Sequence, residues 1–410
     1  MGDTLSARRL AASAIVALLL VGCGGEDAGN QSQPDVDVAA LDSGNYPAAP
    51  QAISDSANVD EGRLREGQRL LDSVALAYEA DPKFAFQSVT GASTVLHPRF
   101  LPSGDISRGK FEVDAPGFVA GVRTRGKRRA GTSNSRELTT YVLLFGSEQQ
   151  AATAAKNLEA SAFRIPYEKP VGDGKVPVSK ERVQIPGHPT AQAHWAPDTR
   201  LLYSWLAQGR FVYWTMAYDQ VMAPIELGPM ADLIAKGLTR QLEAIKNFVA
   251  TPEDKLATLP RDIDGLLART LPGPAKGWEY EQPGVNTAHG ALHYAPRTAD
   301  AKLLYEDTGV DLVAHTSTAV VYRTRDDQQA VRLAGGLADA LSRTMDAAAT
   351  PPNLTGARCF QVRGKPIAGA GDPVSCLTAH DRYTAAVTGA NIQEVHQKVA
   401  AQYKILASGD

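Results

Sequence analysis

The sequence predicts an α+β protein built from two related units, each an antiparallel sheet with helices packed on one face. Segments of the first half of the chain recur in the second half, and in both halves β-rich runs are followed by helix-like runs. A charged stretch with two prolines, residues 251–261, separates the halves and is interpreted as a linker. We therefore expect an N-terminal domain over residues 41–250 and a C-terminal domain over residues 262–410.

The clearest repeat is a strand, a polar turn and a helix. Residues 140–151 match residues 318–330, and each of these segments is a β-rich run followed by a polar turn and the start of a helix. Residues 118–124 match residues 312–318, and residues 95–98 match residues 291–294; we interpret these four segments as strands. Helices are expected over residues 148–162 and 326–345, and after a hairpin over residues 230–249 and 391–407. Helices over residues 62–80 and 262–271 would open the two units, the second one stopped by Pro272.

Residues 1–22 are typical of a signal peptide. Two arginines precede an apolar run over residues 10–21, which is too short to span a hydrocarbon core of about 30 Å. The run ends in Leu-Val-Gly-Cys, which is similar to the bacterial lipobox, whose cysteine receives a diacylglycerol. We expect Cys23 to be the lipidated N-terminus and the protein to be anchored on the extracytoplasmic face of the membrane. A cleaved secretory signal with an incidental cysteine is the alternative, and Sec and Tat export both stay open.

Residues 23–40 are interpreted as the lipidated cysteine and a disordered acidic tether. Residues 24–62 hold eight acidic and no basic side chains, whereas the whole chain has a formal net charge of -3. Removing residues 1–22 takes away a net +1, so the mature chain carries -4 and the part after residue 62 carries +4. The near-neutral total gives no drive toward nucleic acid.

Two cysteines remain once Cys23 is assigned to the anchor. Cys359 and Cys376 are 17 residues apart in a segment expected to form two strands. Outside the membrane such a pair forms a disulfide, which we predict here. The alternative is a metal site that uses His380 as well, but further ligands at useful spacing are missing.

The lipobox, the acidic tether, the run Val-Ala-Ala-Leu-Asp-Ser-Gly-Asn-Tyr-Pro at residues 38–47, the Glu61-Gly62-Arg63 segment and residues 400–403 together carry a family resemblance. The chain resembles an uncharacterised family of two-domain actinobacterial lipoproteins, of the type found in mycobacteria, nocardiae and rhodococci. The resemblance covers essentially the whole mature chain. It implies an envelope location and two domains, and it carries over no catalytic residue.

A basic run is the first candidate for ligand binding. It consists of Arg123, Arg125, Lys127, Arg128 and Arg129, five cations within seven residues. In a hairpin connection these side chains could hold phosphate or carboxylate groups of a lipid or an envelope polymer. A solvated loop without a ligand is the alternative interpretation. The corresponding segment of the second unit is uncharged, so the fold does not require the basic run.

An aromatic hairpin is the second candidate. Seven of the chain's 27 aromatic residues lie within 24 residues, in two strands expected to turn at Gln208-Gly209. We assign Tyr203, Trp205, Phe211 and Tyr213 to one face, and Trp214 and Tyr218 to the other. One face would pack the core, and the other could form a platform or cleft for acyl chains or sugars. The alternative is that both faces are covered.

No motif for a nucleophile elbow, a phosphate loop, a dinucleotide fold or a zinc protease is present, so we expect no catalytic residue, cofactor or metal. His289 and His293, four residues apart, and His188 and His194 are interpreted as ordinary surface or half-buried side chains. The preferred hypothesis is a non-enzymatic lipoprotein that binds an apolar or amphiphilic envelope ligand, such as a lipid, glycolipid or polymer. The rivals are a scaffold with a protein partner and a hydrolase acting on the envelope.

Overall fold

The computed structural model describes residues 33, 35–87, 93–97, 101, 106–130, 135–166, 168–171, 174–221, 226–273, 283–364 and 373–409. The predicted signal peptide, Cys23 and most of the predicted tether lie outside the described residues. No helix within the described ranges combines the length and the apolarity that crossing a membrane requires.

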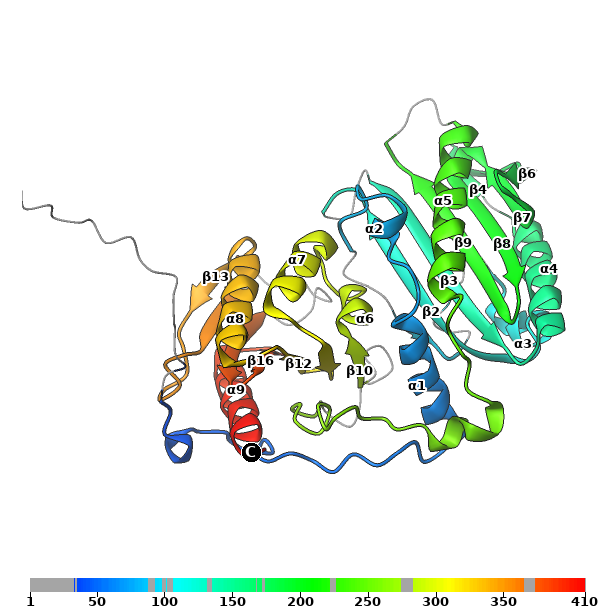
Figure 1. Cartoon of the computed structure of the whole chain (residues 1–410). Helices are drawn as coiled ribbons and strands as arrows, with labels where there is room; N and C mark the ends of the chain where they lie inside the picture. The colour runs from blue at the N-terminus through cyan, green and yellow to red at the C-terminus, as the bar shows by residue number, and fades with distance from the viewer. Residues whose placement is uncertain are drawn as a thin grey trace, which may run out of the picture. The chain divides into compact units, whose positions relative to one another are not determined.

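The N-terminal domain contains a seven-stranded antiparallel sheet (Figure 1). Its strands are β1 (Ser93–Val95), β2 (Phe118–Lys127), β3 (Arg136–Phe145), β6 (Glu181–Ile185), β7 (His188–Ala196), β8 (Leu201–Gln208) and β9 (Phe211–Asp219). They lie in the order β1-β2-β3-β9-β8-β7-β6, so the closing strand β9 is inserted between β3 and β8. A separate ribbon pairs β4 (Glu168–Val171) with β5 (Gly174–Pro177).

The C-terminal domain repeats this topology. Its strands are β10 (Gly284–Thr287), β11 (Leu312–His315), β12 (Ala319–Arg323), β13 (Met345–Ala348), β14 (Arg358–Val362), β15 (Val374–His380) and β16 (Tyr383–Gly389). Their order is β10-β11-β12-β16-β15-β14-β13, again with the closing strand inserted in the middle. The prediction of two related α+β units with antiparallel sheets is confirmed.

Helices cover both faces of each sheet, whereas one covered face was expected. In the N-terminal domain, α3 (Phe111–Asp114) and α4 (Glu148–Arg164) lie on one face, and α1 (Val59–Leu71), α2 (Ala77–Ala80) and α5 (Leu227–Ile245) on the other. In the C-terminal domain, α9 (Ile392–Ala407) covers one face, and α6 (Ala288–Leu292), α7 (Thr298–Thr308) and α8 (Asp327–Ser342) the other. The physical reason is visible in β3, whose residues are buried on both faces from Glu137 to Phe145.

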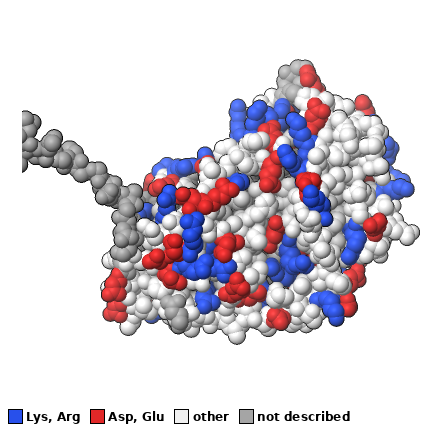
Figure 2. Space-filling model, in the orientation of Figure 1, with Lys and Arg blue, Asp and Glu red and all other residues white. Residues whose placement is uncertain are grey.

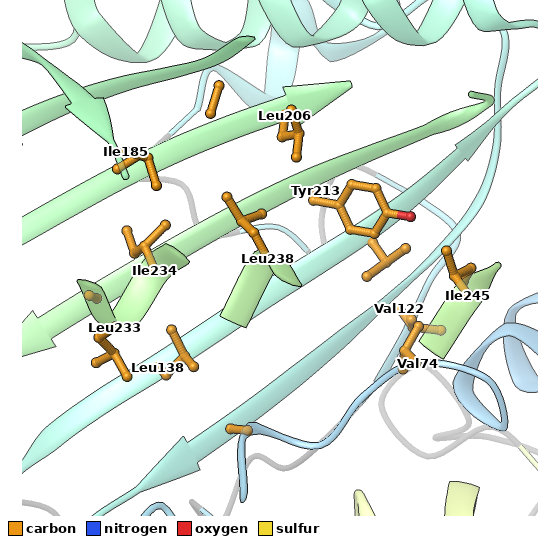
Figure 3. Packing of buried hydrophobic residues seen from close by; sticks show 14 of the residues in the cluster. Val74, Val122, Leu138, Ile185, Leu206, Tyr213, Leu233, Ile234, Leu238 and Ile245 are labelled. Atoms are coloured by element: carbon orange, nitrogen blue, oxygen red, sulfur yellow. The ribbon is translucent and has the colours of Figure 1, made fainter. Parts of the chain in front are cut away.

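The core between α5 and the sheet shows why the helix forms there (Figure 3). Its buried residues recur every three or four positions, as an amphipathic helix requires, and include Ile234, Leu238 and Ile245. They pack in one cluster with Leu206 and Tyr213 of the sheet. Burying each large apolar side chain contributes about 1.5–3 kcal/mol.

The repeated strand, turn and helix is confirmed, and its turns are helix caps. At the start of α4, the Ser147 hydroxyl accepts a hydrogen bond from the backbone N–H of Gln150 at 3.2 Å. The Asp326 carboxylate accepts one from the Gln329 amide at 2.8 Å at the start of α8. These caps satisfy amide groups that the first turn of a helix leaves unpaired.

Two local predictions were wrong. Residues 262–271 form turns rather than a helix, because Asp264 and Gly265 have φ angles of 53° and 70°, in the left-handed region. The carboxylate of Asp262 instead accepts from the amides of two later residues in this turn. Residues 291–294, expected in a strand, begin in α6 and end just after it, with His293 as its C-cap.

The segment before α1 packs on the C-terminal domain, although residues from 41 onward were assigned to the N-terminal one. Leu41 is buried in a cluster with residues of α9, and the amide of Gln51 donates to Ala268 at 3.1 Å. The side chain of Gln33, in the predicted tether, donates to the backbone carbonyl of Asp381 at 2.7 Å and accepts from its amide at 2.8 Å. The predicted linker also packs closely, because Leu256 is buried against α1.

Candidate functional site

Three rows of side chains cross one face of the N-terminal sheet, from β2 through β3, β9 and β8 to β7. Directly opposed residues in antiparallel strands share a face, so the pairing register defines each row. The first row is Arg123, Tyr141, Trp214, Trp205 and Gln192. The second row is Arg125, Thr139, Met216, Tyr203 and His194. The third row is Lys127, Glu137, Tyr218, Leu201 and Ala196.

A surface hollow of about 350 Å³ lies over these rows. Its lining residues are Arg123 and Tyr141 of the first row, Arg125, Thr139, Met216 and Tyr203 of the second row, Glu137, Tyr218 and Leu201 of the third row, and Thr199. The predicted basic run and the predicted aromatic hairpin therefore meet in one place. Sequence reasoning did not find the β3 residues between them, Glu137, Thr139 and Tyr141, because only the strand pairing brings them there.

The basic run lies mainly in a strand, not in a hairpin connection as expected. Residues 123–127 belong to β2, and alternation points Arg123 and Arg125 to the hollow. Arg125 pairs with Glu137, its Nε donating at 3.1 Å, and the Lys127 ammonium lies 2.9 Å from the same carboxylate.

Like Lys127, the other two cations of the run do not line the hollow. Arg128 pairs with Asp81 at 3.1 Å, and its guanidinium lies over the ring of Phe84. Arg129 is exposed. Figure 2 shows Lys and Arg mixed with Asp and Glu over the visible face.

The aromatic side chains form a stack within the rows. The rings of Tyr141 and Trp214 are 4.7 Å apart, those of Trp214 and Trp205 are 5.9 Å apart, and those of Trp205 and Tyr203 are 5.9 Å apart. All four pack in the cluster that α4 covers. Among the described residues, this face therefore presents no large exposed aromatic platform, and the two ends of the stack, Tyr141 and Tyr203, are its members that line the hollow.

The predicted division of the aromatic residues between faces was wrong. Trp205 lies directly opposite Trp214, so both share a face, and Tyr203 lies with them. Tyr213 lies on the opposite face, in the cluster that α5 covers. The reason is parity: in a hairpin with a two-residue loop, an odd-numbered residue stands opposite an even-numbered one. Burial raises the pKa of the Tyr213 hydroxyl far above its ordinary value.

A buried histidine ends the second row and lies next to a buried carboxylate of α4. His194, which is fully buried, places Nδ1 3.5 Å from the Glu159 carboxylate of α4, and Arg182 donates to that carboxylate at 3.2 Å. Burial lowers the pKa of His194 and outweighs the opposing effect of Glu159. Burial would raise the pKa of Glu159, but the nearby imidazole of His194 and the hydrogen bond from Arg182 hold it below its ordinary value. His194 is not an ordinary surface side chain, and no local spacing signals this arrangement.

His289 and His293 have a structural role. Their Nε2 atoms lie 2.9 and 3.2 Å from the backbone carbonyl of Val74, which can only accept. The Nδ1 atom of His293 therefore accepts from the Thr124 hydroxyl, 3.0 Å away. Burial, with the charge of His289, lowers the pKa of His293 to about 3.

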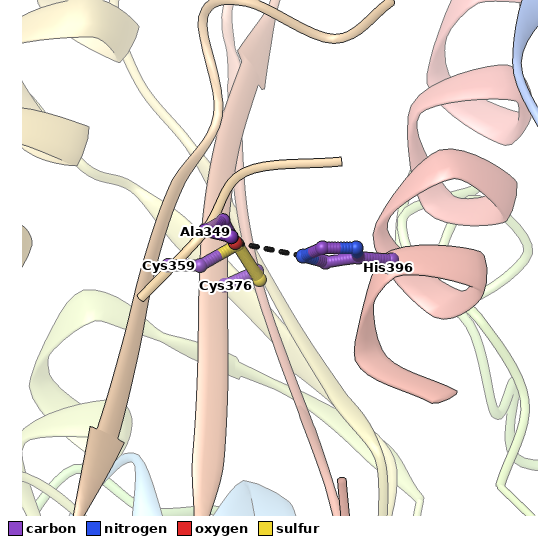
Figure 4. The surroundings of a disulfide bond; sticks show 4 residues. All are labelled: Ala349, Cys359, Cys376 and His396. Carbon is purple, nitrogen blue, oxygen red and sulfur yellow. Dashed lines mark hydrogen bonds between the residues drawn. A yellow bond between two sulfur atoms is a disulfide. The ribbon is translucent and has the colours of Figure 1, made fainter. Parts of the chain in front are cut away.

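The predicted disulfide between Cys359 and Cys376 is present, joining directly opposed residues of β14 and β15 (Figure 4). The histidine beside it is His396 of α9, whose Nε2 donates to the carbonyl of Ala349 at 2.7 Å. The imidazole nitrogen and both sulfur atoms lie within 4.8 Å of one another. Among the described residues, this is the one group of three His, Cys, Asp or Glu side chains that lie close enough together to hold a metal ion. His380, the ligand considered from the sequence, instead contacts the Tyr403 hydroxyl at 3.2 Å.

Comparison with known proteins identifies a family on both halves of the chain. Residues 53–261 match the family model described as the N-terminal domain of unknown function DUF7373, and residues 266–409 match its C-terminal counterpart. No curated protein sequence matches the chain. The two matches together cover most of the chain and coincide with the two sheets, so the protein belongs to the DUF7373 family and carries both of its domains.

Proposed function

We propose that the protein is an actinobacterial envelope lipoprotein, lipidated at Cys23 and anchored on the extracytoplasmic side of the membrane, whose N-terminal domain binds an amphiphilic envelope ligand in the hollow. The carrying observation is that Arg123 and Arg125 converge with the aromatic hairpin, about 80 residues later, on one hollow. The lipobox and its position behind an apolar run support the anchor.

The hollow has two chemically different sides. The guanidinium groups stand on β2, whereas Tyr203 and Leu201 stand on β8, three strand spacings or about 14 Å away. A ligand that fills it has a charged group at one end and apolar surface at the other. A volume of about 350 Å³ is at the low end for small-molecule sites and corresponds to roughly a dozen water molecules. This supports binding of a headgroup and not of a whole diacyl lipid.

Two further observations favour binding over the rival functions. Among the described residues that line the hollow there is no histidine, serine or cysteine, and His194 is separated from it by Tyr203. This arrangement gives little support to a hydrolase. The scaffold hypothesis required an exposed aromatic face, and α4 covers the stack of Trp205 and Trp214.

The anchor is tested by expressing the chain with Cys23→Ser in a bacterium that processes lipoproteins. We expect the unaltered protein to partition into the detergent phase of Triton X-114 and the variant to remain in the aqueous phase. Partition of both forms into the aqueous phase would contradict lipidation.

Ligand binding is tested by native mass spectrometry of the full chain, extracted from envelope membranes in a mild non-ionic detergent. We expect a co-purifying amphiphile in the unaltered protein and its loss in the double variant Arg123→Ala and Tyr218→Ala. Arg129→Ala is the matched control, because it removes an exposed cation of the same run outside the hollow. Equal ligand content in the double variant and the control would contradict the proposal.

A further inference from the structure

A disulfide and a histidine lie together in the C-terminal domain. Cys359 and Cys376 are directly opposed on β14 and β15, and the ring of His396 points from α9 toward them (Figure 4). One imidazole nitrogen and both sulfur atoms lie within 4.8 Å of one another. Two cysteine sulfurs and one histidine nitrogen are a ligand set that proteins use for zinc. The group therefore combines the chemistry and the spacing of a metal site.

The backbone keeps these side chains together without help from the S–S bond. β14 pairs with β15 over four residue pairs, and β15 pairs with β16 over seven. Val395 and Val399, on either side of His396 along α9, are buried in the cluster that also holds both cysteines. In the N-terminal domain, β7 and β8 take the same place in the strand order and contain no cysteine. This strand pair thus folds without a disulfide, so we expect both thiols and the imidazole to stay close together after reduction.

The group cannot bind metal in its oxidised form, and it can be reached from one side. The thiolate is the form of cysteine that binds metal, and a disulfide contains none. Both cysteines are buried, whereas His396 is only partly buried. The exposed side of the group is thus the imidazole, past which a reductant or an ion reaches the sulfur atoms.

We propose that Cys359, Cys376 and His396 form a redox-gated metal site, which opens when the disulfide is reduced and then binds a thiophilic divalent ion of the zinc class. The reductant is a dithiol. It transfers two electrons and two protons to the S–S bond, which breaks into two thiols, while the dithiol itself closes into a disulfide. The ion then replaces the two thiol protons, which leave to solvent, and forms two metal–sulfur bonds and one metal–nitrogen bond.

His396 supplies the nitrogen ligand through Nε2. In the oxidised form this atom donates to the carbonyl of Ala349 at 2.7 Å, so Nε2 carries the ring proton and Nδ1 has the lone pair. When the metal binds, the proton moves to Nδ1 and the hydrogen bond to Ala349 is given up. Three protein ligands leave the fourth position of a tetrahedral ion to a water molecule. The site does not depend on the function proposed for the hollow of the N-terminal domain.

The test uses the full chain with Cys23→Ser, so that Cys359 and Cys376 are its only cysteines. Dithiothreitol reduces the folded protein and is removed by gel filtration under nitrogen, after which the free thiols are counted with Ellman's reagent. Co²⁺ is then titrated, because its tetrahedral thiolate complexes have visible bands and a thiolate-to-metal charge-transfer band, and Zn²⁺ is added to displace it. We expect two free thiols, binding of one Co²⁺ per chain only after reduction, and displacement by Zn²⁺.

The variant His396→Gln removes the imidazole ligand, while its amide can still donate to Ala349. We expect it to weaken Co²⁺ binding by about tenfold or more, because the loss of even an outer-shell partner typically costs about 10–100-fold in metal affinity. His380→Gln is the matched control. His380 lies in the same domain but contacts the Tyr403 hydroxyl, so its replacement should leave the metal affinity unchanged.

Far-ultraviolet circular dichroism of the reduced protein shows whether it stays folded. A thiolate–cobalt band that weakens in His396→Gln and not in His380→Gln supports the proposal, and so does a fold that is lost on reduction and restored by zinc. Four results overturn it: a disulfide that dithiothreitol does not reduce in the folded protein, two free thiols without a thiolate–cobalt band, equal metal affinity in His396→Gln and the control, or unfolding on reduction that zinc does not reverse.

Discussion

Acid should destabilise the fold through His293, and the size of the effect follows from its surroundings. The imidazole is fully buried and neutral, donates to Val74 and accepts from Thr124. Its pKa is about 3, against 6.5 as the ordinary value. The unfolded chain therefore binds a proton below pH 6.5 that the folded chain does not bind until about pH 3. Stability from this group is fully present above pH 6.5 and is lost as the pH falls toward 3.

The magnitude can be worked out for a practical pH. Each pKa unit corresponds to about 1.36 kcal/mol, so at pH 5.0 the folded protein loses about 2 kcal/mol through His293. At pH 7.5 the same linkage is close to zero. The variant His293→Gln keeps a donor and an acceptor on a side chain of similar length and removes the titration. We expect the variant to lose about 2 kcal/mol less than the unaltered protein between these pH values.

The assay is urea denaturation followed by far-ultraviolet circular dichroism at pH 7.5 and 5.0, at constant ionic strength. Groups far from His293 that titrate in this range, including His194, contribute equally to both proteins and cancel in the comparison. An identical loss of unfolding free energy in the variant and the unaltered protein would refute the assignment of a depressed pKa to His293.

Three further predictions concern packing. Gly62→Ala should destabilise the protein by about 1–3 kcal/mol, because a Cβ there would overlap the backbone carbonyl of Leu256 in the linker. In the control Gly228→Ala the new Cβ meets no atom within 4 Å and should not lower the stability measured by urea denaturation. Replacing Cys359 and Cys376 together by alanine should cost about 3 kcal/mol from the freed loop, and equal stability with and without reductant in the unaltered protein would contradict this. Leu41→Ala should lower stability by about 2–5 kcal/mol and expose the preceding segment to limited proteolysis, while resistance equal to that of the unaltered protein would show that this contact is dispensable.

The succession of strands and helices along both units could be anticipated because its signals are local. The turn at Ser147 and the turn at Asp326 both carry a capping side chain, and each follows a β-rich run. The second covered face was harder to foresee, although residues 138–145 are apolar or hydroxyl-bearing throughout and therefore favour burial on both sides. The helix expected over residues 262–271 failed because two left-handed residues decide that backbone, and composition does not reveal them.

The candidate site depended on information that is not local. Arg123 and the aromatic hairpin were both singled out from the sequence, but their meeting requires β3 to pair with both β2 and β9. The partnership of His194 with Glu159 joins a strand and a helix 35 residues apart, with no spacing rule to signal it. The buried indole N–H groups of Trp205 and Trp214, which have no hydrogen-bond partner among the described residues, could not be foreseen at all, since a buried tryptophan normally finds an acceptor.

The duplicated fold provides an internal comparison for the site. On the face that α8 covers, the row equivalent to the first row consists of His315, Val320, Ala386, Leu377 and Arg358. The same strand order therefore folds with a valine, an alanine and a leucine where the N-terminal domain has three stacked aromatic rings, and with His315 in the place of Arg123. Because the same strand order folds without the stacked rings, packing alone does not explain why they stand beside the arginines of the hollow. A ligand held by those arginines and by the aromatic residues that line the hollow explains both, which is why the Arg123→Ala and Tyr218→Ala variants test function and not only packing.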